Sequence, residues 1–263
     1  MRIETCISTL DDGIHRIAAD TFLQEGFSLL IVHQVTQAAD HSALYKRFTD
    51  KGIRIITLQG KGLSISRNAA LENAQGDWLW ICDDDVLPEK GTYLAMVNSI
   101  QNHRSADILT FRMHTPEGND YKKYPADGTA YTLRSATRIS SVEILISSRF
   151  LQQHTLRFDT AFGLASTYPS GEEYIFITDA LRKGAQVIHS ARHIGVHSAE
   201  SSGQQFHAEQ IIGKGAMFAR VFKGRSMLYN YVFSWKKYKS SAYSFWQFYR
   251  LMAEGRKKYL HNA

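Results

Sequence analysis

Short apolar runs alternate with amphipathic stretches along the first half of the chain. The extended apolar runs cover residues 3–10, 27–34, 52–58 and 78–82. Between these runs, apolar residues recur at near-helical spacing, first across residues 14–22 and later across residues 39–50 and 64–74. Strands that alternate with helices predict an α/β fold, in which helices cover a mostly parallel sheet.

The second half of the chain is less regular. Residues 107–113 and 141–147 look like strands, and the polar stretch at residues 115–132 contains the prolines and glycines of a long loop. A helical pattern resumes after Glu172 and closes at Gly184. These elements predict a mixed, mostly parallel sheet that is flanked by helices.

The composition is that of a folded protein. With 263 residues, 44% of them hydrophobic, the chain is long enough for one large domain or for one domain with an appendage. No signal peptide is recognisable, and no run of about 18 apolar residues could cross a bilayer, so we expect a cytoplasmic protein. Cys6 and Cys82 lie in strand-like runs, where buried reduced thiols are expected.

The basic character of the chain belongs to its C-terminal part. The net charge is +6, yet residues 223–263 hold nine Lys and Arg residues against one Glu. Tyrosine, tryptophan and phenylalanine are interleaved with these basic residues from Tyr229 to Tyr259. We therefore expect a catalytic domain at residues 1–222 and a helical, aromatic and basic extension at residues 223–263.

The composition of this extension suits the inner face of a cell membrane. Tyrosine and tryptophan favour the membrane–water boundary, and lysine and arginine are attracted to anionic headgroups. Two alternatives stay open. The aromatics can simply pack the extension onto the domain, or they can bind single-stranded nucleic acid, although no recognised nucleic-acid module accompanies them.

Three adjacent carboxylates, Asp83, Asp84 and Asp85, follow the apolar run at residues 78–82. Each of them needs water, a cation or a hydrogen-bond partner. Alternate residues of an extended chain point the same way, so Asp83 and Asp85 can face one side and hold a hard divalent ion. The alternative is an acidic turn that caps the next helix. In open α/β sheets, ligands bind at the carboxyl ends of the strands, and Thr9 ends the first strand at the same rim.

The order of three motifs resembles a known family. A 62–68 segment that ends in Ser66-Arg67-Asn68 precedes the aspartates, and Gly171-Glu172-Glu173 follows them. This order, over residues 3–203, resembles the family 2 glycosyltransferases, which have the GT-A fold and transfer a sugar from a nucleotide diphosphate donor. The aspartate triplet alone would be weak evidence, so the resemblance depends on order and spacing.

The resemblance implies a metal and nucleotide site. It assigns Asp85, and with it Asp83, to a Mn²⁺ or Mg²⁺ ion that neutralises the donor's pyrophosphate. It also places Asp83 at the ribose, leaves Asp84 without a defined contact, and makes His197 the third metal ligand, which suits Mn²⁺. A zinc helix built on His189, His193 and His197 is disfavoured by Gly195 and the β-branched flanks.

The resemblance further implies a catalytic base at Glu173, with Glu172 as the alternative. Inverting transfer needs a carboxylate that takes the proton of the acceptor hydroxyl. The family usually has Glu-Asp here, so this chain departs from the pattern by one methylene. Gln34 stands where many members of the family have acidic residues that recognise the nucleobase of the donor. Its amide can still form hydrogen bonds with the edge of a uracil ring. Arg67 is expected near the nucleotide, with simple solvation as the alternative.

The resemblance thus implies a metal-dependent, inverting glycosyltransferase that uses a UDP-sugar and a glycan or lipid-linked saccharide in surface polysaccharide synthesis. No nucleic acid is expected as a partner. One alternative is a non-catalytic, membrane-associated scaffold with a degenerate nucleotide-sugar fold, which Gln34 and Glu173 would support. Another is a sugar nucleotidyltransferase, but residues 9–13 lack the glycine-rich basic loop expected of that class.

Overall fold

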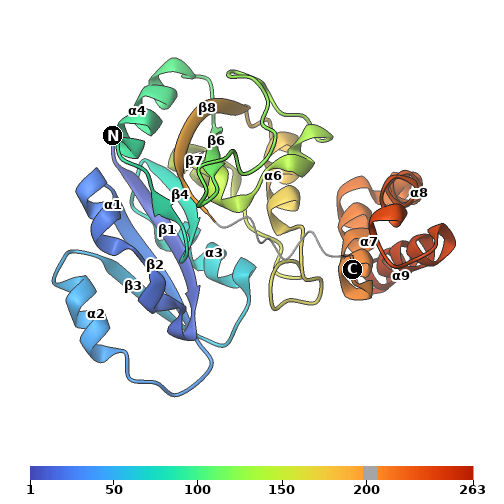
Figure 1. The fold of residues 1–263 in the computed structure, drawn as a ribbon, viewed down its shortest axis with the longest axis horizontal. Coiled ribbons are helices and arrows are strands. Elements are labelled where there is room, and N and C mark those ends of the chain that lie inside the picture. The colour runs from blue at the N-terminus through green and yellow to red at the C-terminus, as the bar shows by residue number, and fades with distance from the viewer. Residues whose placement is uncertain (198–205, 263) are drawn as a thin grey trace. The chain divides into compact units, whose positions relative to one another are not determined.

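The computed structural model describes residues 1–197 and 206–262 of the chain. These residues form two compact units (Figure 1). The first, here called the sheet unit, contains residues 1–61, 65–157 and 177–197; the second, the helical unit, contains residues 62–64, 158–176 and 206–262. The domain boundary expected after residue 222 stays a prediction.

The described residues contain eight strands and nine α-helices. The strands are β1 (Ile3–Leu10), β2 (Ser28–Val35), β3 (Arg54–Gln59), β4 (Trp78–Asp83), β5 (Leu87–Pro88), β6 (Ile108–His114), β7 (Ile144–Ser147) and β8 (Val187–Val196). The helices are α1 (Ala19–Glu25), α2 (Ser42–Thr49), α3 (Leu63–Asn73), α4 (Thr92–Asn102), α5 (Ser148–His154), α6 (Glu172–Arg182), α7 (Ala208–Phe222), α8 (Ser226–Lys237) and α9 (Phe245–Asn262). Within these residues, no helix combines the length and apolarity needed to cross a membrane.

The strands of the sheet unit form one mixed sheet in the order β3-β2-β1-β4-β7-β6-β8-β5. Strands β3, β2, β1 and β4 are mutually parallel, β7 is antiparallel to β4 and β6, β8 is parallel to β6, and β5 is antiparallel to β8. Figure 1 shows helices beside the sheet and the C-terminal helices α7 to α9. The predicted α/β fold, with a mixed and mostly parallel sheet and a helical C-terminal region, is confirmed.

Two elements differ from the sequence pattern. Residues 14–22 do not form one helix: a 3-10 helix, η1 (Asp11–Arg16), ends before the extended Ile17, and α1 begins at Ala19. The strand expected at residues 141–147 starts only at Ile144, because a capping box between Ser140 and Glu143 closes a short 3-10 turn there.

One face of the sheet is covered by helices α1, α2 and α4. Phe22 of α1, Phe48 of α2 and Met96 of α4 are buried in one cluster with Ile7 and Trp80 of the sheet. Burying aromatic and aliphatic side chains of this size contributes about 1.5–3 kcal/mol each. This cluster therefore gives β1 and β4, whose ends carry the candidate site, a rigid support.

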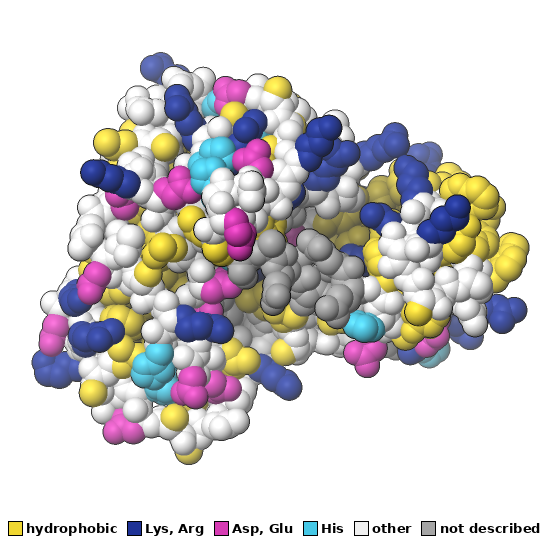
Figure 2. Space-filling model, in the orientation of Figure 1, with side chains coloured by type: hydrophobic (Ala, Val, Ile, Leu, Met, Phe, Trp, Pro, Cys, Tyr) yellow, Lys and Arg dark blue, Asp and Glu magenta, His cyan; other side chains and the backbone are white. Residues whose placement is uncertain are grey.

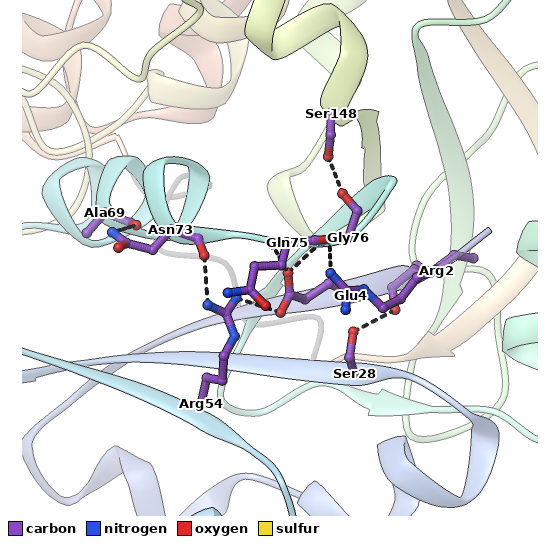
Figure 3. Close-up of polar contacts among 10 residues, drawn as sticks. Arg2, Glu4, Ser28, Arg54, Ala69, Asn73, Gln75, Gly76 and Ser148 are labelled. Atoms are coloured by element: carbon purple, nitrogen blue, oxygen red, sulfur yellow. Dashed lines mark hydrogen bonds and ion pairs between the residues drawn. The ribbon is translucent and has the colours of Figure 1, made fainter.

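A buried carboxylate fixes the other end of the same two strands (Figure 3). Glu4 of β1 is only 2% exposed and accepts hydrogen bonds from Arg54 Nη2 at 2.8 Å, Gln75 N at 2.5 Å and Gly76 N at 2.9 Å. A Cβ at Gly76 would lie 2.7 Å from the Cβ of Glu4, so a side chain there would disrupt the turn. The charge is thus paired as burial requires, and the chain enters β4 in a defined position.

The helical unit is held together by close contact between α7 and α9. A Cβ added at Gly215 would lie 2.0 Å from the carbonyl oxygen of Met252, and one added at Gly255 would lie 1.8 Å from that of Ile212. The two helix backbones therefore approach each other at a point where only glycine fits.

Candidate metal and nucleotide site

Most of the predicted nucleotide-binding residues of the sheet unit lie at the carboxyl ends of three parallel strands, and Arg67 lies in α3. Strand β1 pairs with both neighbours, so that Ser8 is opposite Asp83 of β4 and Leu10 is opposite Gln34 of β2. Thr9 and Asp84 therefore come together at one edge of the sheet. In sheets of this type, that edge is where ligands bind.

Asp84 faces the first strand and the turn after it. Its carboxylate accepts hydrogen bonds from Thr9 Oγ1 at 2.6 Å and from Arg16 Nη2 at 2.7 Å, and the residue is 8% exposed. Burial raises the pKa of Asp84, and the hydrogen bond from Thr9 and the charge of Arg16 oppose this. A Cβ at Gly13 would lie 2.3 Å from the Asp84 carboxylate, so glycine is required where η1 crosses it.

Asp83 is paired with Arg67 of α3. The guanidinium of Arg67 is buried, and its Nη2 donates to Asp83 Oδ1 at 3.0 Å and to Ser141 Oγ at 2.8 Å. The Asp83 side chain stays 29% exposed. Arg67 is therefore not a solvated surface residue, and its charge holds Asp83 at the end of β4.

Asp85, which follows β4, lies beside His197, the first residue after β8. His197 Nε2 is 3.4 Å from Asp85 Oδ1, and the two side chains are 14% and 41% exposed. The hydrogen bond from His197 lowers the pKa of Asp85. Burial alone would lower the pKa of His197, but the hydrogen bond and the negative charge of Asp85 raise it above its usual value.

This pair has the properties expected of two metal ligands. A carboxylate oxygen and an imidazole nitrogen 3.4 Å apart can be bridged by one ion at the usual ligand distance of about 2.0–2.2 Å. The Nδ1 atom of His197 is buried and has no hydrogen-bond partner among the described residues. The mixture of oxygen and imidazole ligands suits Mn²⁺.

The edge beyond β1 is organised by Asp11, a residue to which sequence reasoning gave no role. Asp11 takes a positive φ of 47° and accepts hydrogen bonds from Thr36 N at 2.7 Å and Thr36 Oγ1 at 2.6 Å. Its carbonyl oxygen lies 2.8 Å from Nε2 of His33. Asp11 thus ties the segment after β1 to the segment after β2, next to the buried Gln34. The only sequence signal was its position directly after a strand.

The predicted base residues belong to the helical unit, which is described here by itself. Glu172 is 6% exposed and starts α6 after Gly171, which has a φ of 98°. Burial lowers the pKa of Lys214, and the charges of Glu173 and Glu172 oppose this, so an ammonium group lies near both carboxylates. The sequence gave no hint of Lys214, because this contact joins residues about forty positions apart.

Comparison with known proteins identifies the class of fold. Residues 35–165 match the family model described as Glycosyl transferase family 2. S. aureus TarS is similar in structure, with 16% identity, a TM-score of 0.61, and 89% of this chain but 42% of TarS covered. This chain thus spans less than half the length of TarS. A comparison with curated protein sequences gives no match.

Two structures with bound nucleotide-sugars are also similar. S. aureus TarS 1-349 in complex with UDP-GlcNAc has 15% identity and a TM-score of 0.58, over 89% of this chain and 71% of that chain. The mannosyltransferase PcManGT from Pyrobaculum calidifontis, in complex with GDP-Man and Mn²⁺, has 14% identity and a TM-score of 0.53, over 100% of this chain and 70% of that chain. Residues 35–165 thus match a glycosyltransferase family 2 domain, and the mixed sheet with its flanking helices is GT-A-like.

Proposed function

We propose that the chain is a metal-dependent, inverting glycosyltransferase, with a nucleotide diphosphate sugar as donor. The observation that carries the proposal is the pairing of Asp85 with His197 at the carboxyl end of β4. Asp83 and Asp84 are held by Arg67 and by Thr9 with Arg16, whereas Asp85 is partly exposed beside an imidazole. This leaves Asp85 and His197 to hold the ion, with Asp83 facing the ribose.

The reaction requires each group to do one task. A Mn²⁺ or Mg²⁺ ion held by Asp85 and His197 supplies positive charge for the diphosphate. Gln34 is assigned to bind the nucleotide through its side-chain amide. Arg67 is assigned to act on the nucleotide indirectly, by holding Asp83 in position. In the transfer, the acceptor oxygen forms a bond to the anomeric carbon, the bond from that carbon to the phosphate oxygen breaks, and the nucleoside diphosphate leaves with the electron pair.

Glu173, or Glu172 beside it, takes the proton that the acceptor hydroxyl loses. A carboxylate is suited to this only while it is ionised. Lys214 and the N-terminal end of α6 both place positive charge beside these two carboxylates. Glu173 is the less buried of the two, which supports its assignment as the base.

The nucleotide of the donor is proposed to be UDP. Gln34 offers one donor and one acceptor, which a uracil edge can match. The similar structures were obtained with UDP-GlcNAc in one case and GDP-Man in another, so both nucleotides need to be tested. The sugar is proposed to go to a glycan or lipid-linked saccharide in surface polysaccharide synthesis.

Calorimetry with UDP and GDP, with and without Mn²⁺, tests the donor site. We expect Mn²⁺-dependent binding that is lost in Asp85→Ala and kept in Asp50→Ala, a control that removes an exposed carboxylate. Glu173→Gln should still bind the donor but lose transfer. Undiminished Mn²⁺-dependent binding in Asp85→Ala would refute the metal assignment, and no nucleotide binding by the wild type would favour the scaffold alternative.

We further propose that α8 and α9 contact an anionic membrane surface. Helix α8 is inverted relative to an ordinary amphipathic helix: it buries the polar residues Ser226, Asn230 and Ser234. Its exposed face carries Met227, Leu228, Tyr231, Val232 and Trp235, and Trp235 and Trp246 of α9 are each 64% exposed. An exposed apolar face of this kind marks an interaction surface.

The charges beside this face favour lipid over protein. Arg225, Lys236, Lys237 and Lys239 are exposed at the ends of α8, and Figure 2 shows Lys and Arg side chains beside hydrophobic ones on the C-terminal helices. Each such residue near an anionic surface contributes about 1 kcal/mol. Apolar and aromatic residues with a basic surround are typical of helices that lie in the membrane interface.

A liposome flotation assay tests this surface. The wild type should float with anionic vesicles and not with neutral ones, and Leu228→Ser/Trp235→Ser should weaken binding about 10-fold or more. Leu94→Ser, which removes a leucine that is 66% exposed on α4, is the matched control. Binding of the double variant at the level of this control would refute the proposal, as would a wild-type protein that self-associates in light scattering but does not float.

A further inference from the structure

A second group of potential metal ligands lies in the sheet unit, next to His197, whose backbone N–H donates to the carbonyl oxygen of His114 at 2.9 Å. His114 ends β6, His193 lies in β8, and Asp120 follows β6 in the loop that begins at residue 115. Each of the three can bring one ligand atom within 4.8 Å of the other two. Glu89, directly after β5, lies 2.5 Å from His114 Nδ1 through its Oε1 atom. These four residues are called the histidine cluster below.

The backbone around the histidine cluster is irregular in a way that gathers these side chains. Thr110 pairs with His189, Arg112 with His193, and His114 with Val196, so β8 contains extra residues relative to β6 in both intervals. Bulges of this kind redirect side chains and are frequent beside functional sites. An isolated bridge between His114 and Asp120 brings the loop back against β6.

The contacts within the histidine cluster suit a cation. The rings of His114 and His193 stack with their centroids 3.7 Å apart and their planes at 12°, so one ring has to tilt before an in-plane nitrogen of each can point at the same ion. Imidazole ligates a metal through its unprotonated nitrogen. Asp120 Oδ1 lies 2.6 Å from His193 Nε2, and Arg112 Nη1 lies 3.9 Å from the other Asp120 oxygen.

The ligand types favour zinc over the harder divalent ions. Two imidazoles and one carboxylate are a common zinc set, and ligand atoms around tetrahedral Zn²⁺ lie about 3.4 Å apart, so small side-chain shifts would complete the site. A ligating histidine usually donates its other ring N–H to a carboxylate, and Glu89 takes that position for His114. This leaves Nε2 as the ligand atom of His114.

We propose that His114, Asp120 and His193 bind Zn²⁺, with Glu89 orienting His114, in a structural site separate from the proposed catalytic one. A bound ion would tie the loop of residues 115–132 to β6 and β8, since Asp120 belongs to that loop. The site differs from the zinc helix weighed in the sequence. His189 lies fully buried in β8 with its Nδ1 3.0 Å from Thr110 Oγ1, and it is not among the three residues whose ligand atoms come together.

Zinc binding is measured by calorimetry on the full chain after removal of metals with a chelator. Asp85→Ala is used as the background, because it removes the proposed catalytic ion without touching the histidine cluster. In this background we expect one Zn²⁺ per chain, and at least about 100-fold weaker binding when His114→Ala and His193→Ala are added. His261→Ala, which removes an exposed histidine of α9, should bind as the background does.

Two further measurements keep the outcome clear. Added Zn²⁺ should raise the melting temperature of the background but not of a milder Asp120→Asn variant, and it should slow tryptic cleavage at the exposed Lys123. Absence of Zn²⁺ uptake by the background, or uptake by the double-histidine variant equal to that of His261→Ala, would overturn the proposal. Because nucleotide binding is not measured here, failure of the proposed function would not affect this result.

Discussion

The buried His189 should make the protein less stable as the pH falls below neutrality. His189 is fully buried in β8, its ring stacks on Tyr124, and its Nε2 has no hydrogen-bond partner among the described residues. Burial lowers the pKa of His189 from its usual 6.5 to about 4, and the charge of Arg112 acts in the same direction. The folded protein therefore keeps this ring neutral at pH values where the unfolded chain binds a proton.

The sign and the size of the effect follow from these two pKa values. Above pH 6.5 neither state binds the proton, and the stabilisation is complete. As the pH falls from 6.5 towards 4, the unfolded state binds more protons, so the free energy of unfolding decreases. With pKa values of about 6.5 and about 4, the loss between pH 7 and pH 5 is about 2 kcal/mol.

The assay compares urea denaturation at pH 7 and pH 5 for the wild type, His189→Asn and His261→Asn. Other groups titrate in all three proteins, so the difference between the pH effects isolates the histidine that is replaced. His189→Asn should lose about 2 kcal/mol less than the wild type between the two pH values. His261→Asn, which lacks an exposed histidine, should behave as the wild type does. Equal pH effects in His189→Asn and the wild type would refute the reasoning.

Three further substitutions test contacts near the site and in the helical unit by thermal or urea denaturation. Gly13→Ala should cost about 1–3 kcal/mol, because its Cβ would lie 2.3 Å from the Asp84 carboxylate. Arg67→Met should cost about 1–3 kcal/mol of stability, because Asp83 loses its ion-pair partner but stays partly exposed to solvent. Adding Asp83→Asn to this variant should restore part of the loss, because it removes the unpaired charge. Gly255→Ala should destabilise despite its better helix propensity, since its Cβ would meet a carbonyl oxygen of α7 at 1.8 Å, whereas Gly224→Ala meets nothing within 4 Å. Stability equal to the wild type in any of the first three would contradict the contact invoked.

The sequence predicted the parallel half of the sheet because its signals are local. Strands β1, β2 and β4 are mostly buried, β3 is a half-exposed edge strand, and each of the four is bounded by turn residues or charges that lie next to it in sequence. The pattern therefore placed these strands within two residues of their observed bounds. It also placed the aspartates at the end of β4, from which their common edge with Thr9 followed.

The rest of the fold depends on contacts between distant residues, which a single sequence does not show. The order of β7, β6, β8 and β5 in the sheet is set by pairings that no local pattern indicates. The bulges of β8 bring His193 towards His114; the sequence drew attention to His193 only through its spacing from His189 and His197, and it gave no signal for His114. For α8, the apolar residues were visible, but the burial of Ser226, Asn230 and Ser234 on the opposite face was not, because it requires α9 as a partner.

The three adjacent aspartates illustrate why charge alone did not separate their roles. Two are neutralised within the sheet unit, Asp83 by Arg67 and Asp84 by Arg16, so they hold α3 and η1 against the strand ends. Among the described residues, Asp85 forms an ion pair with the imidazole of His197, which can lose its proton when a metal cation competes for the same position. A divalent ion would replace that proton between Asp85 and His197 without disturbing the other two carboxylates. We therefore expect Asp85→Ala to remove metal binding while leaving the fold intact. A substitution of Asp84 should instead lower the stability of the protein, because Asp84 is the buried partner of Arg16.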